Sequence, residues 1–217
     1  MNCFKNEEGK PILRRMVRAI QENKSYLSDI DGLIGDGDHG VNMNKGFTLF
    51  GDRFADQNIR FSNGLNELGM VLLNEIGGSM GPIYGTIFME MAETAGDAEN
   101  IDLPLFSDML SSGLESLYGI VEARVGDKTL VDTLAPACDA LKDALREKKS
   151  FADAVVDMKK AAIAGKESTK SLTAKYGRSS RLGERSRGVL DAGAVSCCII
   201  LEAMADGIID LCKKNEV

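Results

Sequence analysis

Histidine is scarce in this sequence: one occurs in 217 residues. Cysteine is sparse too, and no two of the five cysteines form a Cys-x-x-Cys pair, which argues against a zinc site. Their odd number and irregular spacing also argue against a disulfide framework. Free thiols are typical of a reducing cytoplasm, which is the location we expect. The cysteines are Cys3, Cys138, Cys197, Cys198 and Cys212.

Positive charge is in deficit as well. Lys and Arg number 26 against 33 acidic residues, which gives a net charge of -7 and a pI of about 4.9. That balance argues against direct nucleic-acid binding, which needs a basic face, and leaves a basic protein partner open. Residues 1–10 contain no apolar signal-peptide segment. The uncharged run at 192–201 is too short to span a membrane, so we expect no membrane association.

Strand signals are also missing, since no alternating β-branched runs lie between hairpin turns. Apolar residues instead recur at helical spacing almost throughout. With 44% hydrophobic residues and no linker, residues 1–217 are expected to form a single all-α domain. We predict an eight-helix antiparallel up-and-down bundle or barrel. The helices are expected at 13–28, from Asp38 or Gly40 to 50, 62–76, 81–91, 104–121, 130–145, from 151 onward and 194–213. Ser62 is expected to be the N-cap of the third helix, and Ser150 to Asp153 a capping box that starts the seventh.

Alternate loops of such a bundle lie at the same end. The loops after the first, third, fifth and seventh helices are the four with unusual residues, namely 31–40, 77–81, 126–129 and 176–193. The sequence therefore predicts one composite site at that end of the bundle.

The loop at 31–40 reads DGLIGDGDHG and combines three carboxylates with the only histidine. Hard oxygen ligands without thiolates favour Mg²⁺ or Ca²⁺, although the spacing is wrong for an EF-hand. The loop matches Gly-x-Gly-x-x-Gly, but the strand of a dinucleotide-binding unit is missing, and the aspartates would repel a pyrophosphate unless metal ions intervened. The alternative is an Asp-rich turn in which Asp38 caps the second helix. For His39, a contact to phosphate or an orienting role toward a metal ligand is favoured over a phosphohistidine.

Two further loops have both a functional and a structural interpretation. GGSMGP at 77–82 precedes a helix, where backbone N–H groups can cradle a phosphate, but it is equally an ordinary helix break. The loop at 176–188 has four arginines that could close over phosphates, or it is a solvated loop. Asp191 either caps the last helix or orients a ligand. GKES at 165–168 lacks the features of a Walker A motif.

Several segments together resemble a known family. They are Asp31 with IGDGDHG at 34–40, NMNKG at 42–46, GG at 77–78 with GP at 81–82 and Gly85, GDKT at 126–129, and GR at 177–178 with LGERS at 182–186 and Asp191. In order and spacing they are similar to the nucleotide-binding L subunit of bacterial dihydroxyacetone kinase. The match extends over almost the whole chain.

The resemblance implies an eight-helix barrel with the nucleotide and two Mg²⁺ ions at one end. It implies that Asp31, Asp36 and Asp38 hold the metal ions, and that these residues act in catalysis together with His39 and Arg178. The nucleotide, a tightly bound ADP or an ATP, would contact His39, Gly40, Val41, Asn42, Gly78, Ser79, Met80, Thr129, Leu130, Arg178, Asp191, Ala192 and Gly193. This chain departs from the family pattern at Met80, where a small residue is common, and at Ala192, where proline is common.

The resemblance also implies Mg²⁺-dependent phosphoryl transfer to dihydroxyacetone or a related short ketose held on a separate K subunit. In one form of the family ADP is a cofactor that a phosphotransferase-system protein rephosphorylates, and the lack of a fused K-type domain favours that form here. The alternatives are an ATP-dependent ketose kinase subunit and a nucleotide-sensing subunit without catalysis that acts on a transcription regulator. A homodimer is left open. A phosphoesterase is disfavoured because no general base stands out.

Overall fold

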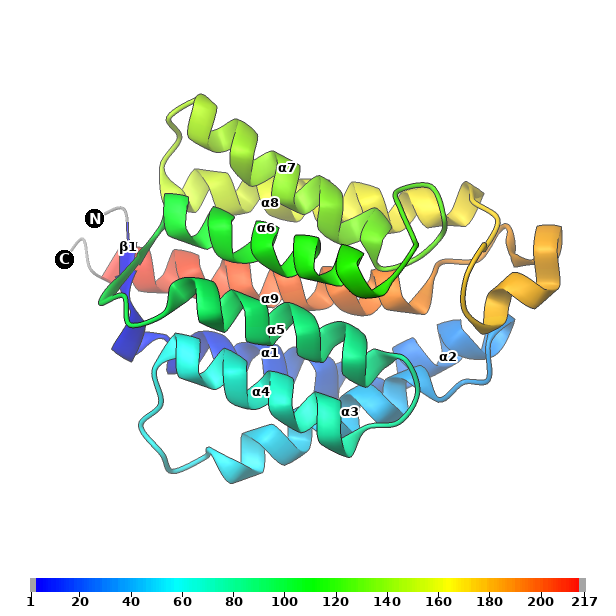
Figure 1. The fold of residues 1–217 in the computed structure, drawn as a ribbon, viewed down its shortest axis with the longest axis horizontal. Coiled ribbons are helices and arrows are strands. Elements are labelled where there is room, and N and C mark those ends of the chain that lie inside the picture. Colours follow the sequence, from blue (N-terminus) through cyan, green and yellow to red (C-terminus); the bar gives the residue numbers. More distant parts are fainter. Residues whose placement is uncertain (1–2, 215–217) are drawn as a thin grey trace.

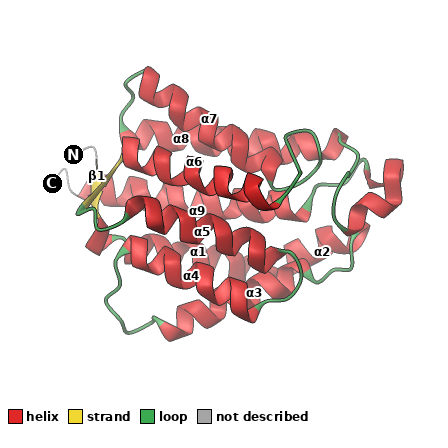
Figure 2. Cartoon of the chain, in the orientation of Figure 1, coloured by secondary structure: helices red, strands yellow, loops and turns green. Residues whose placement is uncertain are grey.

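Amphipathic helices form the wall of an elongated barrel and run along its long axis (Figure 1). The computed structural model describes residues 3–214. This part contains nine α-helices, three short 3₁₀ helices and one two-stranded sheet, so that helix dominates as predicted (Figure 2). The α-helices are α1 (Lys10–Glu22), α2 (Lys24–Ile34), α3 (His39–Arg53), α4 (Phe61–Glu75), α5 (Met80–Ala95), α6 (Leu103–Ile120), α7 (Val131–Arg146), α8 (Phe151–Ser168) and α9 (Ala192–Lys214). The other elements are β1 (Cys3–Lys5), η1 (Asn6–Glu8), β2 (Asn100–Asp102), η2 (Thr169–Ser171) and η3 (Arg178–Ser186).

The helices close into a ring. Each of α3 to α8 packs against the next helix in the chain, and α9 returns to pack against α1, which also contacts α3. Helix α2 continues beyond the end of α1 and contacts α3 and α9 (Figure 1). Because α1 and α2 together make one wall, the barrel has eight walls, and the predicted all-α architecture is confirmed.

The predicted end of the first helix near Ser28 is wrong. The side-chain amide of Asn23 donates to the carbonyl oxygen of Ala19 at 2.8 Å and interrupts the helix there. The chain then re-enters helical conformation, because Leu27, Ile30 and Ile34 continue a buried apolar face. Asp31 therefore lies on the last turns of α2 rather than in the loop.

The prediction that Ser62 caps the third helix is also wrong. Helix α4 begins at Phe61, and Arg60 is its N-cap. Ser62 is buried and pairs with Asn6: its backbone N–H donates to Asn6 Oδ1 at 2.9 Å, and its Oγ accepts from Asn6 Nδ2 at 3.0 Å. These bonds fasten the N-terminal segment to the barrel. Ser150, by contrast, caps α8 as predicted, because its Oγ accepts from the Asp153 N–H at 3.1 Å.

A small antiparallel sheet, which no sequence pattern predicted, closes the end of the barrel near both termini (Figure 2). Phe4 of β1 pairs with Ile101 of β2 and is fully buried. Its ring lies 5.4 Å from the Phe61 ring and 6.3 Å from the Phe151 ring, measured between centroids. An aromatic cluster thus fills this end of the core.

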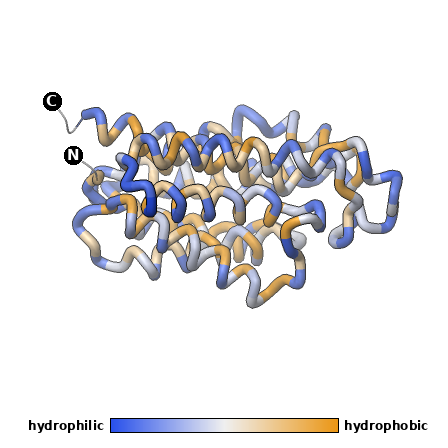
Figure 3. The backbone as a smooth tube through the Cα atoms, turned by 90° about the horizontal axis from the view of Figure 1, so that it is seen from above, coloured by the Kyte–Doolittle hydropathy of each residue, from blue (hydrophilic) through white to orange (hydrophobic). Residues whose placement is uncertain are grey.

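Helix α9 is long and apolar enough to cross a membrane by length and composition alone. In the fold, however, 72% of its most apolar stretch is buried, as expected for a helix of a protein core. At the end opposite the termini, residues 172–190 project from the barrel between η2 and α9 (Figure 1), and the tube there is largely hydrophilic (Figure 3).

Candidate functional site

A cavity of about 470 Å³ opens at the end of the barrel where α3, α5 and α9 begin. Residues from all four predicted loops line it, so the composite site expected from the helix count is present. Its polar lining comprises Asp31, Asp36, Asp38, His39, Ser79, Tyr84, Glu122, Lys128, Thr129, Tyr176, Arg178, Ser179 and Asp191. Its apolar lining comprises Ile34, Met80, Ile83, Leu117, Val121, Ala123, Leu130, Val131 and Ala192, and Gly35, Gly177 and Gly193 complete it.

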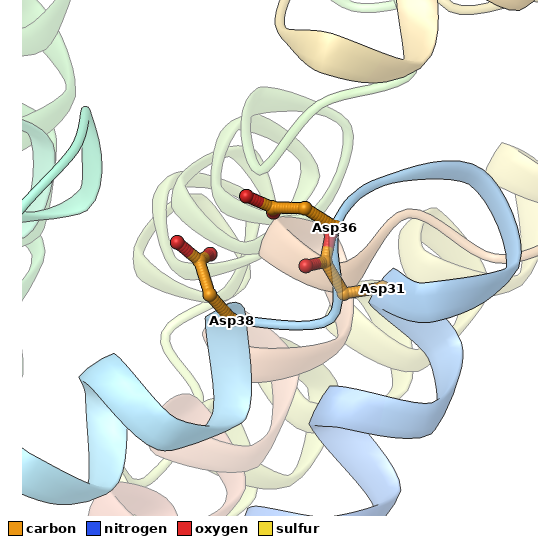
Figure 4. Close-up of side chains that lie close together, drawn as sticks. All are labelled: Asp31, Asp36 and Asp38. Atoms are coloured by element: carbon orange, nitrogen blue, oxygen red, sulfur yellow. The ribbon is translucent and has the colours of Figure 1, made fainter.

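Three carboxylates converge on one wall of the cavity (Figure 4). Asp31 comes from α2, Asp36 from the connecting loop and Asp38 from the N-cap position of α3, and one oxygen of each lies within 4.8 Å of the others. The turn depends on glycine at Gly37, whose φ of 77° is rarely adopted by other residues. At Gly35 a Cβ atom would approach Asp31 Oδ1 to 2.3 Å, so a side chain would displace that carboxylate.

The carboxylates are only partly neutralised by protein groups. The Arg178 guanidinium forms an ion pair with Asp36, and its Nη2 lies 4.0 Å from Asp38 Oδ2. Burial and the neighbouring charge of Asp36 raise the pKa of Asp38, and Arg178 opposes this shift. The Asp38 side chain makes no capping hydrogen bond to α3, so its carboxylate is not committed to the helix start. A cluster of hard oxygen donors with excess negative charge fits Mg²⁺.

His39 begins α3 and is buried. Its backbone N–H donates to Asp31 Oδ2 at 3.3 Å, and its ring Nε2 lies 2.8 Å from Ser196 Oγ in α9. Ser196 Oγ is also 2.6 Å from the hydroxyl of Tyr84 in α5. Burial lowers the pKa of His39 to about 4, although Asp31 opposes the shift, so the ring is neutral near pH 7.

A buried lysine, Lys128, joins the turn before α7 to the segment between α8 and α9. Lys128 has a φ of 60°, and its ammonium group donates to the carbonyl oxygens of Thr169 and Val189, which flank the loop that carries Arg178. Burial raises the pKa of the nearby Asp191 to about 6, opposed by the Ala194 hydrogen bond and the charge of Lys128. Asp191 Oδ1 accepts from the Ala194 N–H at 2.7 Å, so the structure bears out its interpretation as the cap of α9.

Most of the predicted site residues meet in the cavity, whereas four do not line it in the described part of the chain. Those in the lining are Asp31, Asp36, Asp38, His39, Ser79, Met80, Thr129, Leu130, Arg178, Asp191, Ala192 and Gly193. The four outside it are Gly40, Val41, Asn42 and Gly78. At Gly40 a Cβ atom would approach the Lys24 carbonyl oxygen to 2.1 Å, so this glycine allows α3 to pack closely on α2. The roles assigned to all these residues remain predictions.

Of the four arginines at 176–188, Arg178 is the one that lines the cavity. Arg187 instead pairs with Glu184 at 3.0 Å and holds the loop together. Sequence reasoning missed Tyr84, Lys128 and Ser196. Lys128 could have been noticed within the GDKT segment, but Tyr84 and Ser196 lie in apolar helical patterns that give no such signal.

Comparison with known proteins agrees with this arrangement. Residues 33–206 match the family described as the DAK2 domain. The chain is similar to the PEP-dependent dihydroxyacetone kinase 1, ADP-binding subunit DhaL, of Listeria innocua, with 37% identity over 186 residues, 85% of this chain and 88% of that protein. It is 34% identical over 196 residues to the PEP-dependent dihydroxyacetone kinase, ADP-binding subunit DhaL, of Escherichia coli, which covers 89% of this chain and 92% of that protein.

A solved structure shows the same fold. The crystal structure of the dihydroxyacetone kinase of C. freundii in its native form superposes with a TM-score of 0.71 at 22% identity, over 95% of this chain and 36% of that one. The two subunit relatives and the family match extend over most of the chain, as the segments at 31–46, 77–85, 126–129 and 177–191 predicted. The chain therefore belongs to the DAK2 domain family, which contains the ADP-binding subunits of dihydroxyacetone kinases.

Proposed function

We propose that this chain binds ADP or ATP with Mg²⁺ in the cavity and takes part in phosphoryl transfer to dihydroxyacetone or a related short ketose. The observation that carries the proposal is the convergence of Asp31, Asp36 and Asp38 in a cavity that apolar residues of α6 and of the turn before α7 also line. A nucleotide has the same division, with anionic phosphates at one end and a flat base at the other.

The phosphate end is placed near the carboxylates and Arg178. Asp31, Asp36 and Asp38 would hold two Mg²⁺ ions. Such ions, when bound, neutralise phosphoryl oxygens and orient them for in-line transfer. Ser79 is the N-cap of α5, and the N–H groups at a helix start favour an anion. Arg178 adds a fixed positive charge where charge develops during transfer.

The base of the nucleotide is expected to lie against the apolar residues of the lining. Leu117, Val121, Ala123 and Leu130 line the cavity and come from α6, the loop that follows it and the turn before α7. Asp132 holds that turn by accepting from the N–H groups of Gly126 at 2.6 Å and Thr129 at 2.7 Å. A turn fixed in this way keeps Thr129 and Leu130 in place beside the base or ribose.

The acceptor ketose is assigned to a separate K subunit. The relatives that this chain covers over 88% and 92% of their length are named ADP-binding subunits. In the L-erythrulose kinase of Pectobacterium atrosepticum, which is 31% identical, the chain corresponds to 32% of the protein. This contrast supports a division of the two substrates between chains. It also supports ADP as a cofactor rephosphorylated by a phosphotransferase-system protein, since the subunit relatives are named PEP-dependent.

Calorimetric titration of ADP in the presence and absence of Mg²⁺ tests the nucleotide site. We expect Asp38→Asn to weaken Mg²⁺-dependent ADP binding by at least about tenfold, because a hard anionic ligand is lost. Asp29→Asn is the matched control, since it removes the same charge from an exposed position of α2 outside the cluster. Equal ADP affinity in the wild-type protein and Asp38→Asn would contradict the assignment.

The donor is identified by native mass spectrometry of the purified chain followed by a transfer assay. A retained ADP together with two Mg²⁺ ions is expected for the phosphotransferase-dependent form, and a site that fills only weakly is expected for ATP as a substrate. Ketose phosphate should then form when the chain is mixed with a ketose-binding K subunit and the phosphoryl donor. Nucleotide binding without any transfer under these conditions would favour the regulatory alternative.

A further inference from the structure

Three side chains from three different helices form a continuous hydrogen-bonded chain at the edge of the cavity, and two of them line it. Tyr84 lies near the start of α5, Ser196 near the start of α9 and His39 at the start of α3. The Tyr84 hydroxyl is 2.6 Å from Ser196 Oγ, which is 2.8 Å from His39 Nε2. The chain ends at the one histidine of the protein, which lines the cavity.

The distances favour one direction for the hydrogen bonds. The Tyr84 hydroxyl has two acceptors in reach, Ser196 Oγ at 2.6 Å and the Gly193 carbonyl oxygen at 3.3 Å, and donation to Ser196 makes the shorter bond. Ser196 then has one proton to give, either to His39 Nε2 at 2.8 Å or to the Gly193 carbonyl oxygen at 3.1 Å. The nearer acceptor is Nε2. A neutral imidazole that accepts at Nε2 carries its proton on Nδ1.

The other ring nitrogen is accessible from the cavity. Among residues 3–214, two side-chain polar atoms are fully buried without a partner, Ser28 Oγ and Ser111 Oγ. His39 Nδ1 is not one of them, and it makes no hydrogen bond to a described residue. Since the residue as a whole is buried and lines the cavity, Nδ1 is reached from the cavity.

We propose that Tyr84 and Ser196 are positioning residues that fix His39 as the Nδ1–H tautomer, so that the ring presents an N–H donor to a phosphate oxygen of the bound nucleotide. The second half of this proposal rests on the proposed nucleotide site. In this tautomer Nδ1 has no free lone pair, and the lone pair of Nε2 is taken by Ser196. His39 is therefore a hydrogen-bond donor rather than a general base or a phosphorylated nucleophile.

The tautomer can be read directly by ¹H–¹⁵N NMR of histidine-labelled protein, because the single histidine gives one set of ring signals. At about pH 8, above the ordinary imidazole pKa of about 6.5, we expect the Nδ1–H pattern in the wild-type protein. Ser196→Ala should shift the population toward Nε2–H, and Ser196→Thr, which keeps a hydroxyl, should restore the wild-type pattern. Tyr84→Phe, which removes a single oxygen atom, should give a smaller shift in the same direction.

Ser111→Ala is the matched control, since it removes a buried hydroxyl that has no partner, and it should leave the ring signals unchanged. An Nε2–H pattern in the wild-type protein would overturn the proposal. So would an unchanged pattern in Ser196→Ala or, if that variant does not fold, in Tyr84→Phe. Because Tyr84→Phe keeps the volume of the side chain, it tests the proposal even if Ser196→Ala does not fold.

Titration of ADP with Mg²⁺ tests the second half. We expect Ser196→Ala to bind about tenfold more weakly, as for the loss of one well-formed hydrogen bond to a charged group, and Ser196→Thr to recover the affinity. Unchanged affinity in a variant whose tautomer has shifted would overturn the donor role. If the wild-type protein shows the Nδ1–H pattern but binds no ADP, the proposed nucleotide site fails and the positioning of His39 by Ser196 stands.

Discussion

At the end of the barrel that carries β1 and β2, the loops are fixed by packing and by paired hydrogen bonds, whereas at the cavity end they depend on glycines and on charges. Phe4, Phe61 and Phe151 pack together at the first end, and Asn6 and Ser62 satisfy each other there. At the second end, three carboxylates lie close together. Of the seven glycines with positive φ in the described chain, six are in cavity-end loops, namely Gly37, Gly78, Gly126, Gly177, Gly183 and Gly188.

The difference shows how the fold separates stability from function. Strained or glycine-dependent backbone and clustered like charges reduce the stability of the folded state, and they persist where a ligand needs them. The end that carries β1 and β2, the closed end, binds no ligand in this proposal and can supply compensating stability. Substitutions at the two ends should therefore have opposite profiles, with large effects on stability at one end and large effects on binding at the other.

The largest effect is expected from Phe4→Ala at the closed end. The side chain is fully buried between two aromatic rings, so its removal leaves a cavity and should lower the free energy of unfolding by about 4 kcal/mol. Urea denaturation measures this change. The folded Phe4→Ala protein should still bind ADP with Mg²⁺, because the cavity lies at the other end of the barrel.

Leu33→Ala provides the comparison at the cavity end. This side chain on α2 is 67% exposed, so truncation should change the unfolding free energy by less than about 0.5 kcal/mol. If the two substitutions destabilised the protein equally, the contrast between the ends would be wrong.

A smaller effect, and one that depends on pH, is expected from Asp191. Its pKa of about 6 in the folded protein exceeds the ordinary value of about 3.9, so the folded state binds the proton more tightly than the unfolded state. As the pH falls from 7 to 5, protonation of Asp191 should raise the unfolding free energy by about 1 kcal/mol. Asp191→Asn lacks this titration but still caps α9, since asparagine is a good N-cap.

Urea denaturation of both proteins at several pH values measures the difference. Other carboxyl groups titrate in both proteins and cancel from the comparison. The stability of the wild-type protein relative to Asp191→Asn should rise as the pH falls from 7 and level off below about pH 3, where both states are protonated. A difference that is flat with pH would show that Asp191 is not perturbed by burial.

Much of the fold was predictable because helical periodicity is a local signal. The apolar spacing at 62–76 and 194–213 was enough to identify α4 and α9, and the alternation of loops placed Asp36 and Arg178 at the same end. Helix ends were less predictable, because tertiary contacts decided them. Ser62 has the residue type of a cap, but its partner Asn6 is far away in the sequence.

The parts of the site that were missed depend on contacts between helices. Tyr84 and Ser196 satisfy the helical patterns of α5 and α9 by themselves, and only the closure of the barrel brings them to His39 at the start of α3. Lys128 is buried because its ammonium group reaches two carbonyl groups that come more than forty residues later. No local pattern encodes such a partner. The three-residue strands β1 and β2 were likewise too short to give an alternating pattern.

A small effect on stability, in the direction opposite to that of Phe4→Ala, is expected from Asp38→Asn. Burial and the charge of Asp36 raise the pKa of Asp38, which means that its ionised form is disfavoured in the fold. In the absence of divalent cations, the neutral side chain should raise the unfolding free energy by about 0.5 kcal/mol near pH 7. The gain is small because the side chain is 47% exposed and water screens the repulsion.

Thermal unfolding with and without Mg²⁺ and ADP tests this prediction. Without ligands, Asp38→Asn should melt at or slightly above the wild-type temperature. With ligands, the wild-type protein should gain stability according to the ligand concentration and affinity, while the variant should gain much less. A functional group is thus expected to be mildly destabilising by itself and stabilising once its cation is bound. If Asp38→Asn unfolded at a markedly lower temperature without ligands, the Asp38 carboxylate would instead stabilise the fold, as through its charge interaction with Arg178.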